Sequence, residues 1–117
     1  MPKYENDQNT LKKLYFESVK SNKIDQVIDC LQKGISVNSR DEENSGKTAL
    51  HYIAESNLKD MFNLLMAYKP DINIEDDNGQ VPLATAILYD DFEIARSLIK
   101  NGSILPERIQ EMYPEFF

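Results

Sequence analysis

The hydrophobic positions along the chain recur at helical spacing in three successive passes, each followed by a polar, turn-rich segment. Apolar residues three and four positions apart lie on one side of a helix, and each pass contains two such stretches. Thr10 is expected to cap the first helix at its N-terminus, whereas Gly34 and Gly102 are expected to end the second helix of the first and third passes. The stretches predict helices near residues 11–19, 24–31, 50–54, 58–66, 83–87 and 92–99.

These passes have a nearly constant period. Leu50 and Leu83 are 33 residues apart, and Leu31 precedes its counterpart Met66 by 35 residues. The two additional residues lie in the turn-rich segment 38–48, where an insertion costs little free energy. Two helices of this length cannot bury their apolar faces alone. Units of this period are therefore expected to stack side by side and share a continuous core.

The second and third passes open on similar motifs. Residues 46–54 read GKTALHYIA, and residues 79–86 read GQVPLATA. With the 33-residue period, they resemble the ankyrin-repeat family, whose repeats contain the pattern Thr-Pro-Leu-His-x-Ala. The resemblance covers about residues 11–105. Repeats of the family end with a Val-Asn pair, which is matched here by Val37-Asn38 and Ile72-Asn73. The sequence departs from the family at Lys69, where the family prefers Gly, and at Leu105-Pro106, where it prefers Val-Asn.

The resemblance implies an all-α fold, a solenoid of stacked helix-turn-helix units joined by β-turn or hairpin-like tips. Its repeats are expected at about residues 11–38, 39–73 and 74–105, after a frayed N-terminal segment 1–10. A compact helical bundle is the alternative fold, but it does not explain the 33-residue return of the turn motif. Residues 106–117 are expected to form a short C-terminal cap, with Pro106 beginning a helix and apolar residues covering the last repeat, namely Ile109, Met112, Phe116 and Phe117.

The charge of the chain narrows the possible functions. Its 117 residues include 20 acidic and 13 basic ones, which gives a formal net charge of -7. This balance argues against binding to a DNA or RNA backbone, which needs a basic face, and against an anionic membrane surface. No apolar run approaches the length that a bilayer span requires.

The cysteine content and the N-terminal segment indicate in which cellular compartment the protein is expected. Cys30 is the only cysteine, so neither an intrachain disulfide nor a Cys-based zinc cluster is expected. Residues 1–10 are polar and lack the apolar segment of a secretory signal. A reducing, cytoplasmic compartment is the expectation, and an effector delivered into a host cell by a non-classical signal would have the same features.

Two segments resemble ligand-binding loops. Residues 41–48, DEENSGKT, end like a phosphate-binding loop, but Asp41 stands where the first glycine is required and its acidic neighbours would repel phosphate. A turn at Gly46 and a helix cap at Thr48 are therefore expected instead. Residues 71–82 begin like a calcium loop but hold neither its central Gly nor its final Glu, so at most a weak surface contact with calcium stays open. We expect no cofactor.

The single histidine and the single cysteine have structural rather than catalytic interpretations. No partner for general-base chemistry is visible near His51. The resemblance implies that His51 forms hydrogen bonds between neighbouring turns. Cys30 falls on an apolar helix face, so we expect an unreactive, buried thiol.

What remains is a binding surface. The resemblance implies that partners contact the turn tips, residues 40–47 and 75–80, and the concave face of each first helix. Aromatic anchors surrounded by charge are typical of interaction hot spots, and acidic tips would steer a basic partner. Acids are also common in turns and keep proteins soluble, so both interpretations of the acidic tips stay open. The candidate partner-binding residues are Asp41, Glu42, Glu43, Glu55, Tyr68, Glu75, Asp76, Asp77, Leu88 and Tyr89.

The sequence thus predicts a non-enzymatic protein–protein interaction module whose partner has a basic surface. Because the chain is little longer than the array, we expect a monomer that acts as a small inhibitor, an immunity-type protein or an adaptor. The alternative is a homo-oligomeric scaffold that assembles through the apolar C-terminal segment.

Overall fold

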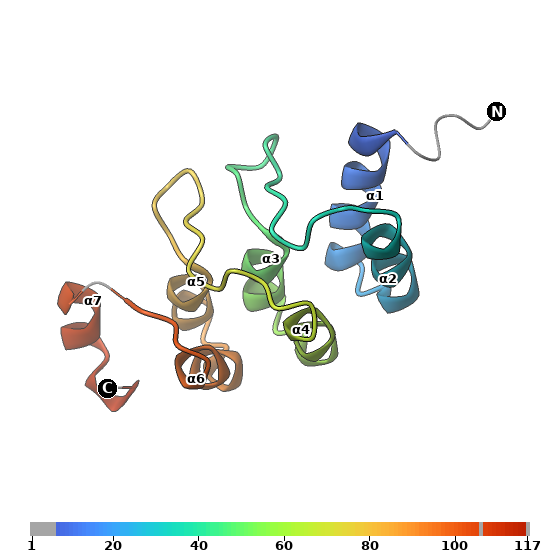
Figure 1. Cartoon of the computed structure of the whole chain (residues 1–117). Coiled ribbons are helices and arrows are strands. Elements are labelled where there is room, and N and C mark those ends of the chain that lie inside the picture. Colours follow the sequence, from blue (N-terminus) through green and yellow to red (C-terminus); the bar gives the residue numbers. More distant parts are fainter. Residues whose placement is uncertain (1–6, 106, 117) are drawn as a thin grey trace.

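The helices occur in consecutive pairs, as the periodicity predicted (Figure 1). The computed structural model describes residues 7–105 and 107–116. Over these residues, the secondary structure comprises α-helices, one 3-10 helix and a single isolated bridge between Asp41 and Lys47. The all-α solenoid is confirmed. The pairs are α1 (Gln8–Lys20) with α2 (Ile24–Gln32), α3 (Ala49–Ser56) with α4 (Lys59–Met66), and α5 (Pro82–Leu88) with α6 (Phe92–Lys100), followed by α7 (Glu107–Met112) and η2 (Pro114–Phe116).

The pairs stack into an elongated body of 54 × 25 × 20 Å. Helices α1, α3 and α5 form one row, the inner row, and α2, α4 and α6 form a second, the outer row, while the tips, residues 40–47 and 75–80, project together to one side (Figure 1). The core runs along the stack between the rows, because each short helix buries its apolar face against its partner and the next pair. Among its fully buried side chains are Tyr15, Ile53, Met61, Leu65, Leu83 and Leu98.

The turn inside each pair uses the same backbone conformation. Asn22, Asn57 and Asp90 occupy equivalent positions and have φ angles of 56, 55 and 61°. Asn and Asp tolerate this left-handed region better than other non-glycine residues. The predicted glycine at the end of the second helix is also left-handed at Gly34, with φ of 104°, whereas Lys69 adopts φ of 53° at the equivalent place. The departure at Lys69 therefore leaves the turn intact at the cost of backbone strain.

The N-terminus of α1 differs from the prediction. The helix begins at Gln8 instead of Leu11, and its N-cap is Asp7, whose side chain accepts a hydrogen bond from the backbone N–H of Asn9 at 3.0 Å. The expectation that Thr10 caps the helix is wrong, because Asp7 satisfies the free N–H groups one turn earlier. Residues 8–10, which were expected to fray, are helical, and they give α1 13 residues against eight in α3 and seven in α5.

The first repeat has polar side chains at places that are apolar and buried in the later repeats. Gln26 is exposed, whereas its equivalents Met61 and Ile94 are buried. Glu17 is likewise exposed, and its equivalent Tyr52 is buried. The first repeat therefore buries fewer apolar side chains at these places than the later repeats do.

Asparagine side chains join consecutive repeats. The Oδ1 atom of Asn38 accepts a hydrogen bond from the backbone N–H of Asp71 at 2.8 Å, and that of Asn73 accepts one from Ile104 at 3.1 Å. These contacts explain the predicted Val-Asn and Ile-Asn pairs, because each asparagine satisfies a backbone donor of the following repeat. Leu105 is buried where the pattern departs from the family.

The C-terminal segment covers part of the last repeat. Ile109 and Tyr113 are half-buried and pack against the core, and the Gln110 side chain donates a hydrogen bond to the Leu105 carbonyl at 2.7 Å. The expectation that Met112 covers the stack is wrong, because this side chain is 67% exposed. Pro106, Phe117 and the side chain of Phe116 lie outside the described residues.

Candidate functional site

The two tips are short hairpins that contact each other. The first is closed by a hydrogen bond from the Asp41 N–H to the Lys47 carbonyl at 2.7 Å, the second by one from the Asp76 N–H to the Gln80 carbonyl at 2.8 Å. The Asp77 N–H donates to the Ser45 carbonyl of the first tip at 2.8 Å. The tips therefore form one continuous edge rather than two independent loops.

Gly46 makes this contact possible, as its predicted role in a turn suggested. It has φ of +65°, and a Cβ atom at this position would lie 2.5 Å from a carboxylate oxygen of Asp77. Thr48 follows as the N-cap of α3, as predicted. The structure thus assigns the segment that resembles a phosphate loop to turn and cap chemistry.

Two of the six tip acids point inward, which the sequence did not predict. Asp41 accepts hydrogen bonds from the Tyr52 hydroxyl at 2.6 Å and from the Asn44 amide at 2.9 Å. Burial alone would raise the pKa of Asp41, but these hydrogen bonds and the Lys20 ammonium hold it below its ordinary value. A carboxylate held in this way is part of the framework, and Asp41 is only 9% exposed in the free chain.

Asp76 plays the corresponding role in the second tip. Its Oδ1 atom accepts hydrogen bonds from the backbone N–H groups of Asn78 and Gln80 at 2.9 and 3.0 Å, and the residue is 6% exposed. This is the ordinary use of aspartate in a turn. Asp76 therefore also belongs to the framework and not to the outer surface.

The other four tip acids are exposed, but they are not equivalent. Glu42 forms an ion pair with Lys12 of α1 at 3.2 Å. Glu43, Glu75 and Asp77 are exposed, and no basic group of the described residues lies within ion-pair distance of them. The accessible negative charge of the tips is therefore smaller than the sequence suggested and is greatest on the second tip.

Next to the first tip, two lysine side chains lie near one aromatic ring. The ammonium groups of Lys20 and Lys47 are 4.7 and 5.7 Å from the centre of the Tyr52 ring, a distance at which cations are attracted to the ring face. Lys47 also forms an ion pair with Glu55 at 2.6 Å. This hydrogen bond to Glu55 is the main reason why the pKa of Lys47 is raised, and it outweighs the opposite effect of burial.

The sequence did not identify this cluster as a unit. Lys20, Tyr52 and Lys47 come from α1, α3 and the end of the first tip, and only the stacking of the repeats brings them together. The repeat register was a usable signal, because Lys20 and Glu55 occupy equivalent positions on neighbouring inner helices. Glu55 is half-buried and already paired, so it contributes less to an open surface than expected.

Leu88 and Tyr89 are the most exposed hydrophobic residues on the inner row of helices. Leu88 is 63% and Tyr89 51% exposed at the end of α5. The equivalent residues in the first and second repeats are the polar pairs Lys20-Ser21 and Glu55-Ser56. The third repeat thus presents an apolar pair to solvent where the other repeats present polar groups.

Tyr68 lies apart from this pair. It follows α4 just before the chain rises into the second tip, and it is 40% exposed. Tyr89 lies at the opposite end of α5 from that tip, and a seven-residue helix is about 10 Å long. The structure therefore does not bring Tyr68 and Tyr89 together into one aromatic site.

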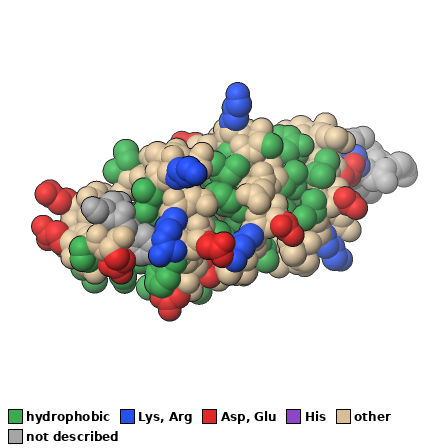
Figure 2. Space-filling model, turned by 90° about the horizontal axis from the view of Figure 1, so that it is seen from below, with side chains coloured by type: hydrophobic (Ala, Val, Ile, Leu, Met, Phe, Trp, Pro, Cys, Tyr) green, Lys and Arg blue, Asp and Glu red, His purple; other side chains and the backbone are tan. Residues whose placement is uncertain are grey.

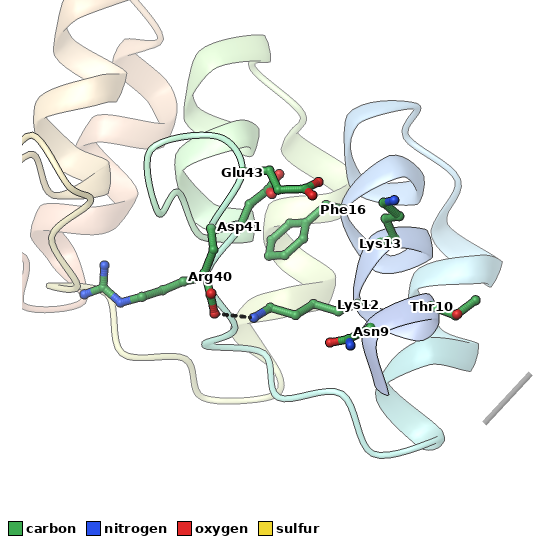
Figure 3. Close-up of a pocket in the computed structure, with 9 residues that line it drawn as sticks. Asn9, Thr10, Lys12, Lys13, Phe16, Arg40, Asp41 and Glu43 are labelled. Atoms are coloured by element: carbon green, nitrogen blue, oxygen red, sulfur yellow. Dashed lines mark hydrogen bonds and ion pairs between the residues drawn. The ribbon is translucent and has the colours of Figure 1, made fainter. Parts of the chain in front are cut away.

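A hollow of about 360 Å³ lies between α1 and the first tip (Figure 3). Phe16 lies at the hollow, with Glu43 and Asp41 on the tip side and Lys12 on the helix side. The ion pair between Lys12 and Glu42 crosses it. Its lining mixes cations, carboxylates and one nearly buried ring, so it does not have the mainly apolar lining of a typical small-molecule site.

His51 has the structural role predicted for it. It is fully buried, its Nδ1 accepts a hydrogen bond from the Thr48 N–H at 3.0 Å, and its Nε2 lies 2.8 Å from the Gln80 carbonyl in the next repeat. Because Nδ1 is an acceptor, Nε2 carries the proton and donates to Gln80. Burial lowers the pKa of His51, although the Gln80 carbonyl, Asp76 and Glu55 act in the opposite direction.

Cys30 is also structural: it is fully buried, and burial raises the pKa of its thiol. In the described part of the chain, no group of three or more His, Cys, Asp or Glu side chains is arranged to hold a metal ion. None of the described helices is long and apolar enough to cross a membrane.

The side away from the tips has a different character (Figure 2). Seen from below, hydrophobic side chains lie among lysines, arginines and acids, and neither sign of charge forms a continuous area.

Fold and surface together define a helical-repeat protein with linked tips. Residues 6–108 match the model of a family described as ankyrin repeats in three copies, and the chain belongs to this family. Ankyrin repeats are generally protein–protein interaction modules and are typically non-enzymatic.

Three curated relatives show how widely such repeats are used. The chain is 32% identical over 83 residues to serine/threonine-protein kinase 12 of Arabidopsis thaliana. It is 34% identical over 80 residues to BCL-6 corepressor-like protein 1 of Homo sapiens and 35% identical over 79 residues to an ankyrin repeat-containing protein of Schizosaccharomyces pombe. These matches cover 71%, 68% and 68% of this chain but only 18%, 4% and 36% of the relatives. The chain therefore spans at most 36% of the length of any of these three relatives.

Proposed function

We propose that this chain binds a partner protein through the tips and the inner row of helices, with the end of α5 as the energetic centre. The observation that carries the proposal is the exposure of Leu88 and Tyr89 at positions where the other two repeats have Lys, Ser and Glu. Bulky apolar and aromatic side chains at the centre of a patch contribute most of the binding free energy in many interfaces.

The linked tips would supply the rim of this interface. The hydrogen bond between Asp77 and Ser45 holds the two tips in one orientation, and preorganised contacts lose less conformational entropy on binding. Glu43, Glu75 and Asp77 supply charge at the rim, where electrostatics mainly affect the rate of association and specificity.

We further propose that binding acts by covering a surface of the partner, as an inhibitor, an immunity-type protein or an adaptor would. The free chain is expected to be a monomer. The scaffold hypothesis is less favoured, because Ile109 and Tyr113 of the C-terminal segment pack against the core of the same chain and are not free to join another.

Affinity capture with matched variants tests this proposal. Ile104 is 67% exposed, close to the value for Leu88, but lies on the loop after α6. A true partner should be retained by the wild type and by Ile104→Ser and lost by Leu88→Ser and Tyr89→Ser, at equal amounts of folded protein. Retention by all four proteins would place the binding surface elsewhere.

A further inference from the structure

The charge of the solenoid changes from one repeat to the next. Residues 11–38 contain five basic and three acidic residues, residues 39–73 four and six, and residues 74–105 two and six. Because the repeats are stacked along a body 54 Å long, this composition becomes a gradient in space. The third repeat, which carries the exposed apolar pair, is the most acidic of the three.

The acids around α5 are also the ones that remain available. Glu75 and Asp77 are exposed on the tip that leads into α5, and Asp90 is exposed directly after Tyr89. For none of these three does a basic group of the described residues lie within ion-pair distance. We call Leu88, Tyr89 and these three acids the third-repeat patch. Asp90 adjoins the apolar pair, whereas Glu75 and Asp77 lie at the other end of the seven-residue helix α5, about 10 Å away, a distance that about three to four residues of an extended segment span.

The first repeat and the start of the first tip are different, because they carry exposed cations. Lys20 lies over the Tyr52 ring and 3.7 Å from Asp41. Lys13 and Arg40 are exposed, with no carboxylate of the described residues within ion-pair distance. A positively charged segment would be repelled at this end and attracted at the other.

We propose that the third-repeat patch binds a segment of the partner in which a bulky apolar residue is flanked by lysine or arginine. This inference rests on the proposed function and specifies the chemistry of the partner. The apolar residue contacts Leu88 and Tyr89, and the flanking cations face Glu75, Asp77 and Asp90. Opposite charges across an interface fix orientation and suppress wrong partners, so the gradient determines in which direction the segment lies along the stack.

The probe for this inference is a phage-displayed library of random 12-residue peptides, selected on the immobilised full chain at about 0.1 M salt. The most enriched peptides are synthesised, and their dissociation constants are measured by fluorescence anisotropy. We expect them to carry net positive charge beside at least one bulky apolar residue. Leu88→Ser should weaken their binding about tenfold, and Ile104→Ser should leave it within twofold.

A charge-neutralised pair isolates the electrostatic part. Glu75→Gln with Asp90→Asn removes two charges from the patch, and Asn suits the left-handed backbone at 90 because Asn22 and Asn57 have the same conformation. We expect binding about threefold to tenfold weaker at low salt. The control, Asp25→Asn with Asp60→Asn, makes the same change in net charge on the outer helices α2 and α4 and should have little effect.

The outcomes separate the two proposals. Neutral or acidic peptides that still lose affinity with Leu88→Ser would overturn the charge inference and leave the proposed function standing. Failure to enrich any peptide above an unrelated control protein, or peptides insensitive to Leu88→Ser, would overturn both. Light scattering that shows a dimer dissociated by Leu88→Ser would identify a second copy as the occupant and overturn the basic-partner inference. If the control pair weakened peptide binding as much as Glu75→Gln with Asp90→Asn, the loss would come from net charge and not from the patch. That result would also overturn the charge inference.

Discussion

Protonation of His51 should destabilise the fold as the pH falls below neutrality. Burial lowers the pKa of His51 in the folded state, so the unfolded chain, with an ordinary value of about 6.5, binds the proton first. The stability contributed by the neutral imidazole is therefore complete above about pH 6.5 and is lost as the pH falls from there toward the folded pKa. Protonation would also turn the Nδ1 acceptor into a donor facing the Thr48 N–H.

The size of the effect follows from proton linkage. A single group that stays neutral in the folded state loses about 1.4 kcal/mol of unfolding free energy between about pH 7.5 and pH 5.5, and this is the upper limit for His51. With a urea m-value of about 2 kcal/mol/M for a small domain, the midpoint should move by up to about 0.7 M. Asp76, Glu55 and Lys47 are the charged neighbours of the imidazole.

The measurement is urea unfolding followed by circular dichroism at both pH values, for the wild type and for His51→Gln. The glutamine cannot titrate but can still reach the Gln80 carbonyl, so the difference between the two proteins isolates the histidine from the carboxylates that both share. We expect the wild type to lose more stability than the variant on acidification. Parallel losses, or an NMR titration that gives His51 a pKa at or above about 6.5, would refute the reasoning.

Three further variants test the backbone and the contacts between repeats. Lys69→Gly should stabilise the fold by about 0.5–1 kcal/mol in thermal or urea unfolding. The change removes left-handed backbone strain of about 1–2 kcal/mol but adds conformational freedom to the unfolded chain. A loss of stability would contradict the left-handed φ of 53° at Lys69. Asn38→Ala should cost about 1 kcal/mol, the net value of its hydrogen bond to the next repeat, and an unchanged urea midpoint would show that water replaces it. Gly46→Ala should cost more than Gly34→Ala, since both strain the backbone but only the first meets Asp77, and equal unfolding free energies would contradict the contact between tips.

Much of the fold was predictable, because the information is local and repeated. The 33-residue return, the positions of the six paired helices and the glycine after α2 depend on apolar spacing and turn propensities within a few residues. The start of α1 was not predictable in the same way. Asp7 and Thr10 are both good N-caps, and the choice between them depends on the backbone that follows.

The candidate surface was predictable only in part. The repeat pattern placed Leu88 and Tyr89 on the concave helix face but left open whether Leu88 packs on its neighbour, and the structure shows both side chains exposed. The sequence did not show which tip acids are accessible. Asp41 and its neighbour Glu42 are both acidic, but Asp41 is buried against the Tyr52 hydroxyl whereas Glu42 is exposed. Whether these residues contact a partner stays a prediction.

The sequence by itself determined the repeat unit and its count, because hydrophobic period and turn chemistry act between residues close in the chain. Tertiary structure alone decided which charges are used internally. Asp41 is held by the Tyr52 hydroxyl of the following helix, and Lys20 reaches the same ring from the preceding repeat. Such contacts join residues from separate elements whose meeting depends on the stacking geometry, so the free acidic charge left on the third repeat is a property of the assembled solenoid.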